Sequence, residues 1–188
     1  MHVDPAHLEF AENALPLNWL EVAKLLHENA RALHDQDLGT ITQVRRGKAV
    51  TRRTSNRPVF LLAAFALENL LKAFLIYENP KYIEGGKLSR QLLNGHGLSQ
   101  LQAACRKIPS PKRTRHVFET LEVGINSWAR YPCATSVARE TEEREVTDAF
   151  WREYNKVFDL YCRRLETLLV KRWTGPYGKV GYVTFTAE

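Results

Sequence analysis

The chain has 188 residues, of which 44% are hydrophobic and 26% are charged, and its formal net charge is +6. This ordinary globular composition favours one domain spanning residues 1–188. The three cysteines, Cys105, Cys133 and Cys162, are odd in number and lack Cys-x-x-Cys spacing, which argues against disulfides and a zinc site. We therefore expect reduced thiols, no metal and no cofactor.

The N-terminal segment, MHVDPAHLEFAENALP, is acidic and interrupted by prolines. A secretory signal begins with basic residues and continues into an unbroken apolar stretch. The segment has neither feature, so we expect a cytoplasmic protein.

The first strong helical period lies between Leu17 and Leu33, directly after Pro16. Apolar residues recur there at steps of three and four, which is typical of the buried face of an amphipathic helix. The opposite face carries a basic stripe of Lys24, His27, Arg31 and His34. Such a stripe is either plain solvent-exposed surface or a ligand-binding face.

Residues 45–57 read RRGKAVTRRTSNR and contain six basic residues and no acidic one. β-branched residues flank this basic stretch, so residues 41–57 form either a short hairpin with Gly47 in the turn or a disordered basic loop. A second acid-free basic block, RKIPSPKRTRH, occupies residues 106–116. The two blocks are either solvated surface or contacts for an anionic partner, of which a phosphate backbone is the commonest.

The segment Val59–Tyr77 is apolar on nearly all sides. Ser55 or Asn56 can cap its start, and Pro58 fits its first turn. The Asn-Pro and Gly-Gly dipeptides beyond residue 78 end it. A helix that is apolar all round belongs in the core, so we expect it to be the central, most buried element.

Glu68 and Lys72 interrupt this helix at its midpoint. Each charge would cost about 2.5–3.5 kcal/mol in a bilayer, which disfavours a membrane span although the length fits. Glu68 precedes Lys72 by four residues, the favourable order for an ion pair, and Asn69 lies on an adjoining face. These groups either pair at a wet helix surface or line a polar pocket or interface inside the fold.

Three further helical segments follow. The first spans about Leu98–Ile108, the second begins at Ser110 and Pro111, and the third begins at Thr147. The polar segment 133–145 is predicted as a loop, and the tail 175–188 is strand-like or disordered. Five helical segments with little convincing strand predict an all-α bundle.

Three segments together resemble the HEPN superfamily: ALENLLKAFLI at residues 66–76, GHGLSQL at 95–101 and WARYP at 128–132. The resemblance implies a HEPN-like helical-bundle domain. HEPN proteins are often ribonucleases of toxin–antitoxin, abortive-infection or phage-defence systems that use an Arg-x(4–6)-His motif. Other members lack the motif and act as nucleotide-binding or partner-binding modules.

Under this resemblance, Arg90 and His96 match the motif with five intervening residues. His96 would act as general acid or base, and Arg90 or Arg130 would stabilise the developing phosphate charge. His96 precedes a helix start, where a bound phosphate is favoured. It can equally cap that helix or hydrogen-bond Glu68.

The predicted catalytic set is His96, Arg90, Arg130 and Glu68. The predicted RNA contacts are Arg45, Arg46, Lys48, Arg52, Arg53, Lys72 and Tyr131, with Lys24 as a further backbone contact. An alternative for Arg130 is that it complements the dipole of the helix it follows, with Tyr131 packed on Trp128.

The resulting hypothesis is a HEPN-like RNA-binding protein, with metal-independent RNA cleavage as its enzymatic form. The alternative is a non-catalytic helical module for dimerisation or partner docking. The expected partners are RNA or another polyanion, an antitoxin or defence-system protein, and a second copy of the chain. The sequence contains no Walker A loop, G-x-G-x-x-G turn or H-E-x-x-H motif, so nucleotide hydrolysis, dinucleotide redox chemistry and zinc hydrolysis are not expected.

Overall fold

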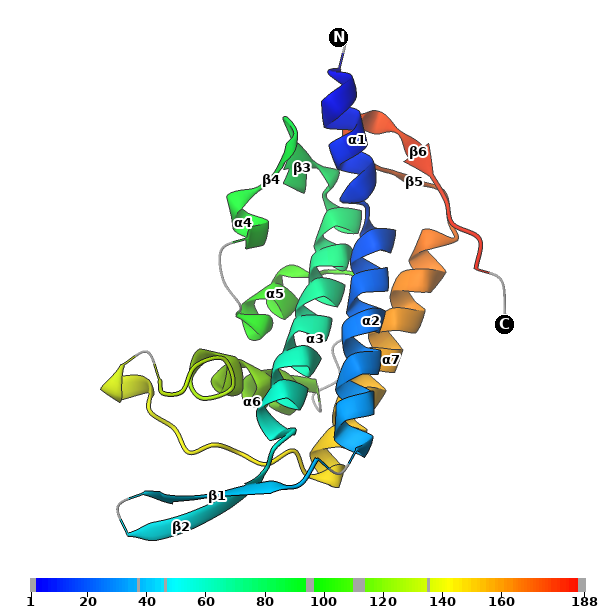
Figure 1. Ribbon diagram of the computed structural model, residues 1–188. Coiled ribbons are helices and arrows are strands. Elements are labelled where there is room, and N and C mark those ends of the chain that lie inside the picture. The colour runs from blue at the N-terminus through cyan, green and yellow to red at the C-terminus, as the bar shows by residue number, and fades with distance from the viewer. Residues whose placement is uncertain are drawn as a thin grey trace.

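The computed structural model of the protein describes residues 3–36, 38–45, 47–93, 97–109, 114–134 and 136–185. Helices dominate (Figure 1), and the longer ones are α1 (Pro5–Asn13), α2 (Pro16–Asp35), α3 (Asn56–Glu78), α5 (Leu98–Ala104), α6 (Thr114–Asn126) and α7 (Asp148–Leu169). Shorter pieces are α4 (Arg90–Leu93) and the 3₁₀ turns η1 (Pro80–Tyr82), η2 (Val137–Arg139) and η3 (Pro176–Gly178). The predicted helix start at Ser110 and Pro111 lies outside the described residues.

The helix α3 is the centre of the core, because α2, α5, α6 and α7 all contact it. Leu67, Leu70, Leu71 and Phe74 on α3 have no exposed surface. By length and composition α3 is apolar enough to cross a membrane, but 78% of its apolar window is buried inside the fold. This burial is that of a core helix in a soluble protein, and it confirms that α3 is the central buried element.

The basic stripe of α2 divides between surface and core. Lys24 lies at the surface and pairs with Glu166 at 2.6 Å. His27 is only 7% exposed, and its ring stacks on Phe158 with centroids 4.1 Å apart. Its Nδ1 lies 3.1 Å from the hydroxyl of Tyr154. Neither interpretation of the stripe holds for His27, because aromatic residues of α7 close over it.

Residues 40–53 form an antiparallel hairpin of β1 (Thr40–Arg45) and β2 (Lys48–Arg53). Gly47 in the connection has a φ of 76°, in the left-handed region that glycine adopts without strain. Threonine and valine in both strands favour extended backbone. Of the two interpretations of residues 41–57, the hairpin is therefore the one observed, and it extends away from the helices (Figure 1).

Two smaller antiparallel sheets lie at the opposite end of α3 (Figure 1). They pair β3 (Ile83–Glu84) with β4 (Lys87–Leu88), and β5 (Trp173–Thr174) with β6 (Val180–Gly181). The prediction of an all-α bundle is therefore wrong, since the described part of the chain is mostly helical but includes three small sheets. The β3–β4 turn depends on Gly85 and Gly86, whose φ values are 60° and 68°. Such short strands carry no periodicity, so a search for helical periods does not detect them.

Burial lowers the pKa of His27 because the imidazolium is poorly solvated in the core. In the unfolded chain a histidine titrates near pH 6.5. The unfolded state therefore binds more protons as the pH falls below about 7, so the free energy of unfolding should decrease from about pH 7 to pH 5. Urea unfolding should show a smaller decrease for His27→Gln than for the wild type. An equal decrease in both proteins would contradict this assignment.

Candidate functional site

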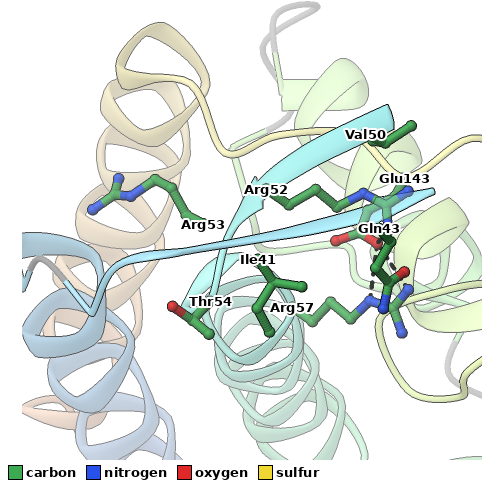
Figure 2. Close-up of a pocket in the computed structure, with 8 residues that line it drawn as sticks. All are labelled: Ile41, Gln43, Val50, Arg52, Arg53, Thr54, Arg57 and Glu143. Atoms are coloured by element: carbon green, nitrogen blue, oxygen red, sulfur yellow. Dashed lines mark hydrogen bonds and ion pairs between the residues drawn. The ribbon is translucent and has the colours of Figure 1, made fainter. Parts of the chain in front are cut away.

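The arm, defined as the hairpin of residues 40–53, has two different faces. Side chains alternate along a strand, so the register places Ile41 and Gln43 on the same face as Val50 and Arg52. These four residues line a cavity of about 190 Å³ at the start of α3 (Figure 2). The opposite face carries Thr40, Thr42, Val44, Ala49, Thr51 and Arg53.

Glu143 joins the arm to the rest of the protein at this cavity. Its side chain is 3% exposed, and its carboxylate accepts from Arg52 at 2.8 Å and from Arg57 at 2.8 and 2.9 Å. The amide of Asn56 donates to its other oxygen at 3.0 Å. The strand β2, the helix α3 and the coil before α7 thus meet at one buried acid.

Asn56, the first residue of α3, also fixes the coil that carries Glu143. Its Nδ2 donates to the carbonyl of Arg144 at 3.0 Å, and its Oδ1 accepts from the N–H of Val146 at 2.9 Å. The N-cap position is occupied by Ser55, without a side-chain capping bond. Sequence reasoning missed Glu143 because it lies 86 residues from Arg57, and no local spacing connects the two.

The predicted RNA contacts of the arm have different environments. Arg52 binds Glu143, and Nη2 of Arg53 donates to the carbonyls of His34 at 2.8 Å and Gln36 at 3.4 Å, at the end of α2. Both arginines therefore have structural partners. Lys48 is exposed at the tip of the arm. Arg46 lies outside the described residues, as does the side chain of Arg45.

Glu68 and Lys72 form the ion pair that their spacing predicted, with Nζ 2.6 Å from Oε1. Their side chains are only 6% and 9% exposed. The Lys72 ammonium also lies 5.8 Å from the ring centroid of Trp19, within cation–π range. Asn69 donates to the carbonyl of Phe65 at 2.8 Å. The pair is enclosed by the fold, so Lys72 presents little surface to an RNA phosphate.

A carboxylate of the protein itself lies at the start of α5, the helix that follows His96 in the sequence. His96 itself lies outside the described residues, but Ser99 in the first turn of α5 donates its backbone N–H to Glu122 at 3.1 Å. A cavity of about 610 Å³ lies beside it, and Glu119, Glu122 and Arg139 are among its charged lining residues. A carboxylate already at the positive end of the helix makes this start less favourable for a phosphate than the sequence suggested.

Arg90 and Arg130 are both exposed but belong to different parts of the fold. Arg90 opens α4, and Arg130 follows α6. The guanidinium of Arg130 lies 5.2 Å from the ring centroid of Tyr131, which is 42% exposed, whereas Trp128 packs edge-on against Phe60 at 4.6 Å. Neither arginine is among the described residues that line the cavity at the start of α5.

Removing one partner of the Glu68–Lys72 pair should cost much more stability than removing both. In Glu68→Leu the Lys72 ammonium loses its partner inside the core, and we expect a loss of about 3–5 kcal/mol. The double variant Glu68→Leu/Lys72→Met replaces both charges with apolar groups and should recover most of that loss. Urea unfolding of the single and double variants measures the coupling free energy, and purely additive losses would argue against a coupled buried pair.

No protein-family model, curated protein or solved structure matches the chain. The HEPN resemblance therefore stays a prediction that rests on residues 66–76, 95–101 and 128–132. Function has to be inferred from the charge, burial and contacts of the residues described above.

Proposed function

We propose that the protein binds RNA through the arm, whose basic residues contact the phosphate backbone. The arm extends from the helices (Figure 1), and Lys48 is exposed at its tip, next in sequence to Gly47 in the connection between the strands. The sequence from residue 38 to residue 57 contains no acid. A protruding basic ribbon can neutralise several phosphates at once and release their counterions.

The distribution of charge is the observation that carries this proposal. The chain contains 27 Lys and Arg residues and 21 Asp and Glu residues. Six of the basic residues lie in residues 45–57, which leaves 21 elsewhere to balance the 21 acids. The whole excess of +6 therefore belongs to the arm and the first turn of α3. Such clustering is typical of a polyanion-binding surface.

The HEPN resemblance favours RNA over other polyanions, and it makes a homodimer and an antitoxin-like or defence-system partner part of the same proposal. We place the protein in the cytoplasm. Cys105, Cys133 and Cys162 are free thiols, as is usual in a reducing compartment. Burial raises the pKa of Cys162 to about 12, so this thiol stays protonated and unreactive.

Metal-independent cleavage is the enzymatic form of this proposal. Arg90 is exposed at the start of α4, six residues before His96, so its guanidinium is accessible to a phosphate. In this reaction His96 accepts the proton of the RNA 2′-hydroxyl, and the 2′-oxygen forms a bond to the adjacent phosphorus. The bond from phosphorus to the 5′-oxygen breaks, and that oxygen takes up a proton from water and leaves as a hydroxyl. A histidine titrates near neutral pH, which suits this proton transfer. Glu68 forms an ion pair with Lys72, and its part in the chemistry stays a prediction.

Replacing the basic residues of the tip should weaken RNA binding equally across RNA sequences. For each phosphate that Arg45, Arg46 or Lys48 no longer neutralises after substitution by Ala, the plot of log affinity against log salt should flatten by about 0.7 units on single-stranded RNA. Fluorescence anisotropy with several labelled RNAs at a series of salt concentrations measures both effects.

The matched control removes the same charge from exposed positions of α7, with Arg152, Lys156 and Arg163 changed to Ala. It should leave the salt slope close to that of the wild type. Equal flattening by the two triple variants would indicate a general charge effect and would refute a specific role for the arm.

Cleavage should be independent of divalent metal and should depend on His96. Purified wild type should produce 2′,3′-cyclic phosphate ends in EDTA, and His96→Ala should reduce the rate by about 10²–10⁴-fold. His116→Ala changes an exposed histidine of α6 and serves as the control with unchanged rate. If the wild type binds RNA but cleaves none, the enzymatic form is wrong and the non-catalytic module is supported.

A further inference from the structure

The cavity beneath the arm has the composition of an anion site. Among the described residues that line it are three arginines, Arg52, Arg53 and Arg57, and a single acid, Glu143. Arg53 lies on the opposite face of the arm, and its guanidinium binds backbone carbonyls at the end of α2. The two guanidinium groups of Arg52 and Arg57 and the carboxylate of Glu143 therefore leave a net charge of +1 at a space of about 190 Å³. Neutralising one buried carboxylate requires no such excess.

Glu143 holds Arg52 and Arg57 in place, but its single negative charge does not neutralise both. Its carboxylate contacts one nitrogen of Arg52 and two nitrogens of Arg57. Each guanidinium group carries further N–H donors, and the two side chains remain 23% and 32% exposed. The buried acid therefore holds two forked donors in fixed positions at the cavity wall, an arrangement that suits the oxygens of a phosphate.

Gln43 contributes a neutral group from the arm. It pairs with Val50 in the hairpin register, and Figure 2 shows its side chain beside Glu143 and Arg57. Its amide nitrogen can donate to an anion at no cost in charge. The Thr54 hydroxyl differs, because it already donates to backbone carbonyls of residues 38 and 39 at 2.6 Å.

We propose that this cavity binds one phosphate group, held by Arg52 and Arg57 with Gln43 as an additional donor. The inference deepens the proposed RNA binding, on which it rests for the source of the phosphate. A backbone phosphate of RNA and a free phosphate present the same oxygens to the same donors. With RNA as the source, the arm contacts its ligand at two places, the exposed tip and the root.

Two substitutions at neighbouring residues test the cavity. Gln43→Glu adds a negative charge inside it with almost no change of shape, whereas Val44→Glu adds the same charge on the opposite face, where Val44 is 72% exposed. Isothermal titration calorimetry with inorganic phosphate at constant ionic strength should show about a tenfold or greater loss of affinity for Gln43→Glu. Val44→Glu should change the affinity by less than about twofold, because its charge is screened by solvent. Circular dichroism and urea unfolding establish that both variants fold.

An RNA oligonucleotide with a 5′-hydroxyl has only backbone phosphates. Its binding shows whether the phosphate bound in the cavity comes from the RNA backbone or is free phosphate. If the cavity takes a backbone phosphate, Gln43→Glu should flatten the salt dependence of RNA binding by about 0.7 log units, and inorganic phosphate should compete with the RNA. If RNA binding is unchanged while phosphate binding is lost, the phosphate site stands with free phosphate as its source.

Two other outcomes separate this inference from the proposed function. Absence of phosphate binding by the wild type, or equal losses in Gln43→Glu and Val44→Glu, overturns the phosphate site and leaves RNA binding by the tip intact. Phosphate binding without RNA binding overturns the proposed function and leaves the cavity as a site for free phosphate.

Discussion

The burial of most of α3 inside the fold is the constraint on which the rest of the structure depends. Removing apolar surface from water contributes about 25 cal/mol per Å², so a helix of this composition stabilises the fold only when other elements cover it. The helices α2, α5, α6 and α7 do so. The charged pair of Glu68 and Lys72 lies inside this enclosure, where each charge has the other at 2.6 Å and the ammonium faces Trp19.

The middle of α3 is enclosed by other helices, whereas side chains at its two ends bind the connecting segments. At the C-terminal end, the Glu78 carboxylate accepts from the backbone N–H groups of Arg106 and Lys107 at 2.8–2.9 Å, which holds the segment after α5. At the N-terminal end, Asn56 and Arg57 hold Glu143. In both places a side chain at one end of the core helix fixes a coil that is distant in sequence.

Sequence patterns predicted the parts of this structure whose information is local. The helices α2, α3 and α7 are long, so their apolar periods are unambiguous, and the i,i+4 pairing of Glu68 with Lys72 follows from helix geometry. The clustering of basic residues at 45–57 is equally local. The Glu143 contacts, the burial of His27 under α7 and the short pair of β3 with β4 depend on tertiary packing, so no spacing in the sequence signals them.

The way the arm is anchored explains why it remains strongly positive. An isolated two-stranded hairpin is marginally stable in water, so the order of the arm depends on contacts at its root. Those contacts include Arg52, Arg53 and Arg57, of which Arg53 binds neutral carbonyls and the other two share the single carboxylate of Glu143. Three arginines are therefore held in place by contacts that include only one carboxylate. The contacts that order the arm therefore preserve its positive potential. If each arginine were paired with its own carboxylate, that potential would be cancelled.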